Sequence, residues 1–231
     1  MDGVKQAVPS AIEYPFCDAS TLDEFTLEMR RIFFLTANLV ELFRDRDDVS
    51  VASNLMWFPV EARPDIRFAP EVSVVFGRPK RDRVAYKQWE EIGVPITVAF
   101  DVMQGEAPAS RSFHRDEFYY DYGLEERYLY FPDVNRLYVY VRDGDGVVLI
   151  RRLEEFVSPR MGLRFRQTNP ELTFLNPNGS PFLPIEELAV RVAERSRAER
   201  AAQWDAKDVQ RARLANQDQQ RDARLARRRS M

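Results

Sequence analysis

The sequence predicts a mixed α/β domain followed by a long C-terminal helix. Glu71–Phe76 is almost continuously apolar, the pattern of a strand buried on both faces. A second apolar run, Ile96–Met103, is followed by the helical segment Phe113–Tyr122 and the strand Arg127–Phe131. From Ile185 to Ser230 the chain has neither proline nor glycine. Strands interleaved with helices predict a mixed sheet flanked by helices, and the last segment predicts one long helix.

Composition sets the broad class. The chain has 231 residues, of which 45% are hydrophobic and 12% aromatic, so a packed core is expected. No run approaches the roughly 20 apolar residues of a membrane helix, which predicts a soluble, cytoplasmic protein. The single cysteine, Cys17, excludes an internal disulfide. The single histidine, His114, excludes a His-rich zinc site, and the net charge of -3 gives no overall basic field for nucleic acid.

Before the central stretch, one helix and two strands are expected. Ser20 or Thr21 is placed to cap a helix that runs to about Arg44, whose apolar residues recur at helical spacing. Val49–Ala52 and Asn54–Val60 follow as strands. Gly77–Gly93 is a polar connection that includes a helical turn around Tyr86–Ile92.

After Gly123, a good helix C-cap, the alternation is that of a β-meander. The expected strands are Arg127–Phe131, Arg136–Arg142, Val147–Leu153, Gly162–Arg166 and Leu172–Leu175. Asp143–Gly146 forms the hairpin turn between the second and third of them. Composition changes at Pro184, so we predict a core domain over 1–183 and a helical extension over 184–231.

Three polar residues of the central stretch stand at positions with chemical meaning. Glu71 opens one strand, Asp101 lies within the next, and Arg115 lies early in the following helix. Two acids on neighbouring strands with a cation on the next helix are the layout of a magnesium nuclease site. Magnesium prefers such hard oxygen ligands and can activate water for phosphodiester hydrolysis.

Motifs around these residues resemble a large bacterial restriction-endonuclease-like family of the PD-(D/E)XK nuclease superfamily. The matching segments are Ala69-Pro70-Glu71, Tyr86-Lys87-Gln88-Trp89-Glu90-Glu91-Ile92-Gly93, Ala99-Phe100-Asp101-Val102-Met103-Gln104, Arg115-Asp116-Glu117-Phe118-Tyr119, Gly123-Leu124-Glu125-Glu126-Arg127-Tyr128 and Met161-Gly162-Leu163. The resemblance covers the chain from about Thr21 to its end. It implies a restriction-endonuclease-like mixed sheet and a Mg²⁺-dependent DNA endonuclease.

The resemblance also implies roles for individual residues. Glu71 and Asp101 would hold the Mg²⁺ ion, and Arg115 would complete the catalytic set at the scissile phosphate. The expected substrate-binding residues are His114, Gln104 and Lys80. The family has Asp, Glu and Lys where this chain has Glu71, Asp101 and Arg115, and usually Ser where it has Gln104, so the site is degenerate.

The departures favour weak or absent cleavage. Each carboxylate is displaced by one methylene, and small misplacements cost large factors in rate. Arginine stays protonated, so Arg115 can clamp a phosphate but is a poor base. The structural alternative is an ion-paired remnant in which Arg115 bridges Glu71 and Asp101. On the same helix, Asp116 and Glu117 are expected to be solvated, and Tyr119, Tyr120 and Tyr122 to be packing residues.

Three functions stay open at this point. The first is a DNA endonuclease that uses Mg²⁺. The second is a catalytically silent nuclease fold that acts as a binding or assembly subunit, with Ile185–Arg229 contacting a protein partner or a second copy. The third is DNA binding without cleavage through the terminal arginines Arg224, Arg227, Arg228 and Arg229.

Overall fold

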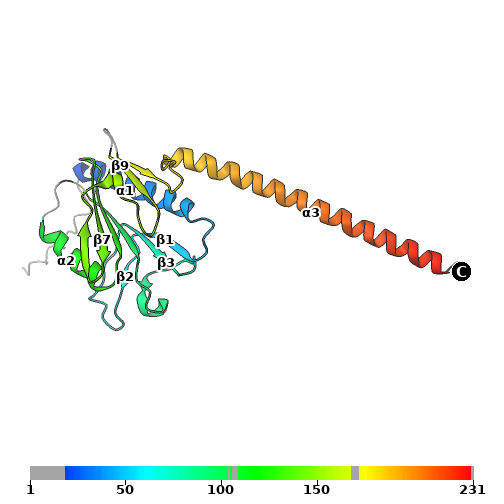
Figure 1. Cartoon of the computed structure of the whole chain (residues 1–231), viewed down its shortest axis with the longest axis horizontal. Helices are drawn as coiled ribbons and strands as arrows, with labels where there is room; N and C mark the ends of the chain where they lie inside the picture. Colours follow the sequence, from blue (N-terminus) through cyan, green and yellow to red (C-terminus); the bar gives the residue numbers. More distant parts are fainter. Residues whose placement is uncertain (1–18, 104, 106–108, 168–171, 230–231) are drawn as a thin grey trace, which may run out of the picture. The chain divides into compact units, whose positions relative to one another are not determined.

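The computed structural model describes residues 19–103, 105, 109–167 and 172–229. The chain divides into two compact units, Met1–Phe182 and Leu183–Met231 (Figure 1). The first unit contains, in chain order, α1 (Ala19–Leu42), β1 (Val49–Ser53), β2 (Trp57–Phe58), β3 (Val72–Phe76), β4 (Tyr86–Lys87), the 3-10 helix η1 (Gln88–Glu91), β5 (Val98–Val102), α2 (Ala109–Asp121), β6 (Glu126–Phe131), β7 (Arg136–Asp143), β8 (Gly146–Leu149), the 3-10 helix η2 (Leu153–Glu155), β9 (Arg164–Gln167) and β10 (Leu172–Leu175). The second unit contains α3 (Ile185–Arg229).

A six-stranded mixed sheet organises the first unit, with strand order β1-β3-β5-β6-β7-β8. β5 and β6 are parallel, and the other neighbours in this sheet are antiparallel. A parallel pair needs a crossover connection, and α2 supplies it between β5 and β6. Two smaller pairs accompany the sheet, β2 with β4 and β9 with β10. The predicted mixed α/β fold with a long C-terminal helix is therefore confirmed.

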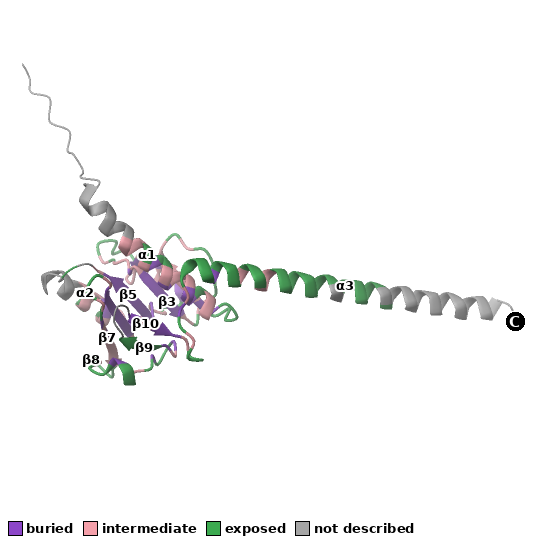
Figure 2. Ribbon diagram, turned by 90° about the horizontal axis from the view of Figure 1, so that it is seen from above, coloured by how far each residue is buried: buried purple, intermediate pink, exposed green. Residues whose placement is uncertain are grey.

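The two faces of the sheet are buried in separate cores because successive strand residues point to opposite faces. On one face, Val74, Phe100 and Tyr130 pack with Leu35 and Leu39 of α1. Figure 2 shows β3 and β5 in the colour of buried residues. The opposite face carries a second core under α2, formed by the buried residues Trp57, Val75, Tyr86, Ile96, Ala99, Tyr119 and Leu124. Burial on both faces explains why β3 and β5 are nearly continuous in apolar residues; β6 is also buried throughout but begins with the charged pair Glu126 and Arg127.

Most of the expected elements are present, with shifted ends. The predicted strand Asn54–Val60 is a strand only at Trp57–Phe58, and the predicted strand Val147–Leu153 ends at Leu149. The predicted helical turn is split between β4 and η1. The N-cap prediction at Ser20 or Thr21 is wrong, because both residues lie inside α1. Local propensity places an element more reliably than it places the first hydrogen-bonded residue.

Gly123 ends α2 as predicted, and the reason is steric. Its φ is 99°, and a Cβ at this position would lie 3.1 Å from Cγ of Pro95. The amide of Leu124 then bonds the carbonyl oxygen of Tyr119, which turns the chain into β6. Glycine is thus required both by the backbone conformation and by the close approach of Pro95.

Of the helices in the described part of the chain, none is both long enough and apolar enough to cross a bilayer. The long helix α3 is instead polar over most of its 45 residues. Its first turn carries Glu186 and Glu187, where negative charge favours a helix N-terminus. Its side chains from residue 214 onward lie outside the described residues, and these include the four terminal arginines of the DNA-binding hypothesis.

Candidate functional site

The register of β3 against β5 brings the two predicted acids together. The antiparallel pairs Val72↔Phe100 and Ser73↔Ala99 make Glu71 the next residue opposite Asp101. Residues directly opposite on antiparallel strands have Cβ atoms roughly 5 Å apart and share a face. Both carboxylates therefore lie on the α2 side of the sheet.

The neighbouring strand β6 adds an arginine to this face. Arg127 is opposite Ala99 in the parallel β5–β6 pair, so its side chain lies on the same face as Asp101, two residues along β5. Nε of Arg127 donates to Oδ2 of Asp101 at 2.7 Å. Asp101 is fully buried and Arg127 is 1% exposed, so this ion pair is shielded from water.

Helix α2 closes the site with residues one turn apart. Arg115 and Tyr119 are four residues apart and so project from one side of the helix. Nη1 of Arg115 lies 2.9 Å from Oδ1 of Asp101 and 3.4 Å from Oε2 of Glu71. The hydroxyl of Tyr119 donates to the same Oδ1 at 2.9 Å. The guanidinium of Arg127 also pairs with Asp116 of α2. We call these six residues (Glu71, Asp101, Arg115, Asp116, Tyr119 and Arg127) the Asp101 network.

The bridging arrangement expected for an ion-paired remnant is thus the geometry observed, with Arg115 between Glu71 and Asp101. Whether the three residues act in catalysis stays a prediction. Their convergence does show that segments 30 and 14 residues apart meet at one position, as the layout of the motifs required.

Glu71 has an unusual protonation equilibrium. Its side chain is 15% exposed, and burial is the largest cause that raises its pKa, to about 8. The negative charge of Asp101 and a hydrogen bond between the two carboxyl groups raise the pKa further, and the charge of Arg115 opposes them. At neutral pH the protonated form of Glu71 therefore predominates.

Protonation of Glu71 balances the charges of the network. The remaining acids, Asp101 and Asp116, carry two negative charges, and Arg115 and Arg127 carry two positive charges. Uncompensated charge in a buried site costs several kcal/mol per ion in general, so a neutral set is the stable one. The network compensates itself without an additional ion.

Two further residues surround Arg115. Its guanidinium carbon lies 4.3 Å from the centre of the Phe68 ring, a cation–π contact. Burial raises the pKa of Glu28 of α1, while the positive charge of Arg115 lowers it, which places this acid within the electrostatic reach of the site. Neither residue was predicted from the sequence as part of the site: Phe68 directly precedes the motif Ala69-Pro70-Glu71 but is not part of it, and Glu28 lies in α1, away from the motifs.

Of the predicted substrate-binding residues, Lys80 is the one whose side chain the structure describes, and it lies outside the Asp101 network. Nζ of Lys80 donates to the carbonyl oxygens of Phe43 and Arg44, just beyond the end of α1. Gln104 lies outside the described residues, as does the side chain of His114, whose backbone belongs to α2. Their roles at a substrate remain predictions.

One expectation about α2 needs correction and another needs an addition. Asp116 was expected to be solvated, but its side chain is 32% exposed and pairs with the buried Arg127. Tyr119 packs as expected, and it also donates a hydrogen bond to Asp101.

The sequence did contain a signal that Arg127 belongs to the site. An arginine within an apolar strand, next to the strand that carries Asp101, needs a buried acid as its partner.

As a metal site, the donor set is small. Glu71 and Asp101 are the two carboxylates in mutual contact, and the described residues contain no group of three or more His, Cys, Asp or Glu side chains arranged to hold an ion. Both oxygens of Asp101 already accept from cationic or hydroxyl donors. These residues, as arranged, do not fit an octahedral Mg²⁺ ion, which needs free carboxylate oxygens.

Comparison with known proteins finds similar solved structures but no match by sequence. No known family profile matches the chain, and no curated protein matches it by sequence. Among solved structures it is similar to a "putative nuclease belonging to DUF820" from Anabaena variabilis, with a TM-score of 0.40 and 8% identity. The match covers 56% of this chain and 70% of that chain. The chemistry of the site therefore rests on the contacts of its own side chains.

Proposed function

We propose that this chain is a nuclease-fold protein whose hydrolytic centre has become a buried ion-pair network. In this view it acts as a binding or assembly subunit and has weak or no nuclease activity. The observation that carries the proposal is the state of Asp101, whose two carboxylate oxygens accept from Arg115, Tyr119 and Arg127 while the side chain is fully buried.

The chemistry of phosphodiester hydrolysis supports this reading. A metal-dependent nuclease needs ionised, unshielded carboxylates and a group that can take up or deliver a proton. Here one carboxyl group is held protonated by its surroundings, and the other is neutralised by two arginines. Arginine at position 115 remains charged at any physiological pH and cannot exchange the proton that lysine can.

The helix α3 supports the binding role. It spans Ile185–Arg229, a length of about 68 Å at 1.5 Å per residue. Val190 and Trp204 stand two heptads apart, and their side chains are 59% and 66% exposed. Large apolar side chains that recur on one side of a polar helix are typical of a surface that pairs with another helix. We therefore propose a second copy of this helix or a helical partner as its ligand.

A plasmid-nicking assay tests whether the Asp101 network lacks nuclease activity. Wild-type protein, Asp101→Asn and the triple variant Glu71→Asp/Asp101→Glu/Arg115→Lys are incubated with supercoiled DNA and Mg²⁺ or Mn²⁺. The triple variant restores the acids and lysine of the family and shows whether the scaffold can still support cleavage. We expect wild-type and Asp101→Asn to be equally inactive. Metal-dependent nicking by the wild type that Asp101→Asn abolishes would establish the enzyme instead.

Light scattering coupled to gel filtration tests whether α3 mediates self-association. If α3 pairs with a second copy, the wild type has a concentration-dependent mass that Trp204→Glu shifts toward the monomer. Val134→Glu is the control, because Val134 is 52% exposed in the first unit. A monomer at all concentrations would exclude self-association and leave only a partner of another sequence.

A further inference from the structure

A cavity of about 400 Å³ lies apart from the Asp101 network. It is open to solvent and lies between the end of α1, β1 and the loop of residues 78–83. Its lining residues are Val40, Phe43, Val49, Ser50, Val51, Lys80, Arg81 and Asp82. Small-molecule pockets typically measure roughly 300–1,000 Å³. The size is thus that of a binding pocket for a small ligand.

The floor of the cavity is apolar. Val40, Phe43 and Val49 come from α1 and β1, and the side chain of Val40 is 50% exposed. A half-exposed valine next to buried apolar groups leaves apolar surface in contact with water. A ligand with an apolar body would cover this surface favourably.

The rim is polar and held in place. Lys80 donates from Nζ to the carbonyl oxygens of Phe43 at 2.6 Å and of Arg44 at 2.7 Å, which leaves a third N–H of the ammonium group. Arg81 pairs through Nη2 with Glu91 and keeps its other guanidinium donors. Side chains fixed before binding lose little conformational entropy when a ligand arrives.

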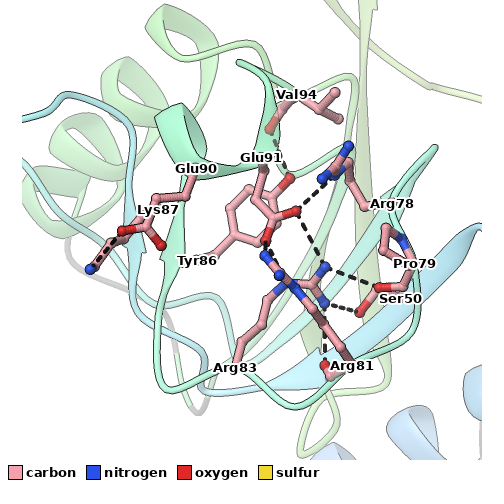
Figure 3. Close-up of polar contacts among 10 residues, drawn as sticks. All are labelled: Ser50, Arg78, Pro79, Arg81, Arg83, Tyr86, Lys87, Glu90, Glu91 and Val94. Carbon is pink, nitrogen blue, oxygen red and sulfur yellow. Dashed lines mark hydrogen bonds and ion pairs between the residues drawn. The ribbon is translucent and has the colours of Figure 1, made fainter.

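The anchor of this rim has an excess of positive charge. Glu91 is buried, and it accepts from Nε of Arg78 at 2.7 Å, from Nε of Arg83 at 2.8 Å and from Arg81 (Figure 3). We call these four residues the Glu91 cluster. Hydrogen bonds from Arg83, followed by those from Arg81 and Arg78, outweigh burial and lower the pKa of Glu91 to about 2. One carboxylate therefore faces three guanidinium groups at neutral pH.

The three arginines are not equivalent. Arg83 is 5% exposed and also bonds Ser50 and two backbone carbonyls, and Arg78 is 16% exposed. Arg81 is 51% exposed, and it alone of the three lines the cavity. Arg83 and Arg78 suffice to neutralise Glu91, so the positive charge of Arg81 is available to a ligand.

From this arrangement we propose that the cavity binds a small carboxylic acid with an apolar body. The carboxylate lies between Arg81 and Lys80 at the rim, and the apolar part covers Val40 and Phe43. Guanidinium groups bind carboxylates through paired hydrogen bonds. Asp82, the one acid among the lining residues, disfavours a second negative charge and so favours a monoanion over a dianion.

Titration of the full chain with octanoate tests the proposal. Binding is measured by calorimetry and by changes in amide chemical shifts. We expect saturable binding that shifts resonances of residues 40–51 and 80–82. Three control ligands test each feature: acetate has the carboxylate without the apolar chain, octanol has the chain without the charge, and hexyl phosphate is a dianion. Each should bind at least about tenfold more weakly than octanoate, a difference of ~1.4 kcal/mol in binding free energy.

Matched variants distinguish binding in the pocket from nonspecific binding elsewhere on the protein. Arg81→Ala should weaken octanoate binding at least about tenfold, while Arg63→Ala, an arginine 57% exposed and paired with Asp65, should not. Val40→Glu should abolish binding, while Val134→Glu should leave it intact. The proposal is overturned if octanoate shows no saturable binding or if octanol or hexyl phosphate binds as tightly. Equal affinities for the two arginine variants would overturn it as well.

Discussion

The Asp101 network and the Glu91 cluster use the same chemical groups with opposite charge ratios. In the first, three carboxyl groups face two arginines beneath α2. In the second, one carboxylate faces three arginines in a loop. In the Asp101 network, a proton on Glu71 removes the excess negative charge. In the Glu91 cluster, the excess positive charge includes the half-exposed side chain of Arg81.

The difference shows how burial decides the fate of an unbalanced charge. Asp101 and Arg127 are shielded from water, so the network has to reach neutrality internally. In the Glu91 cluster one member, Arg81, is 51% exposed, so solvent can screen the excess of charge at that side chain. A neutral buried set suits a structural role, and an excess of positive charge on an exposed side chain suits binding an anion.

The largest effect is expected when the buried network loses its central acid. Asp101→Ala leaves Arg127 buried and without its Nε partner, so we expect a loss of about 3–5 kcal/mol in the free energy of unfolding. Urea denaturation measures it, with Asp101→Asn as the milder variant that keeps the shape. A loss below about 1 kcal/mol would show that the network is not structural.

Removal of the acid of the second cluster should cost less. Glu91→Gln keeps the size of the side chain but weakens three charge-assisted hydrogen bonds, for an expected loss of about 2–3 kcal/mol. Arg78 and Arg81 can turn to water, which limits the effect. The neighbouring exposed acid provides the control, since Glu90→Gln should stay within about 0.5 kcal/mol.

The two clusters should respond to pH with opposite signs. Folding raises the pKa of Glu71 from 4.5 to about 8, so the folded state binds more protons and stability falls as pH rises through this interval. The slope reaches at most ~1.4 kcal/mol per pH unit, and Glu71→Gln should remove it. Folding lowers the pKa of Glu91 to about 2, so its contribution is lost as pH falls from 4.5 toward 2.

These signs are checked by thermal melts of wild type, Glu71→Gln and Glu91→Gln between pH 2 and pH 9. A wild-type stability that rises from pH 5 to pH 8 and does so equally in Glu71→Gln would contradict the assignment of Glu71.

The smallest effect is expected for the exposed member of the Glu91 cluster. Arg81→Ala should leave the melting temperature unchanged within error, because Arg78 and Arg83 still hold Glu91. Arg83→Ala, which removes a guanidinium 5% exposed, should lower it clearly. Equal effects would mean that Arg81 is structural and would weaken its assignment to ligand binding.

The sequence predicts the fold better than the site. Apolar runs and helical spacing predict β3, β5, α2 and β6, because a strand buried on both faces leaves a strong pattern. The meeting of Glu71, Asp101 and Arg115 follows from motif order. The fully occupied state of Asp101 depends on the β5–β6 register and on the rotamers of α2, which leave no local pattern in the sequence.

Short elements were predicted less well for the same reason. β2 is reduced to Trp57–Phe58 because its partners are the short strand β4, 29 residues away, and a single bridge from Trp57 to Phe68. The arginines of the Glu91 cluster read as a solvated loop, since nothing local identifies Glu91 as buried. Tertiary contacts, not propensities, determine both.

The burial of β3 and β5 on both faces has a consequence for folding. Because β3 and β5 carry apolar side chains on both faces, a slip of one residue exchanges the two faces and still leaves mostly apolar side chains in a core, so the hydrophobic effect opposes it weakly. Such a slip of β5 would move Asp101 to the face opposite Arg127, Arg115 and Tyr119 and leave its charge buried without them. The ion pairs thus also specify the strand register, and we expect their removal to produce misaligned sheets as well as a less stable native one.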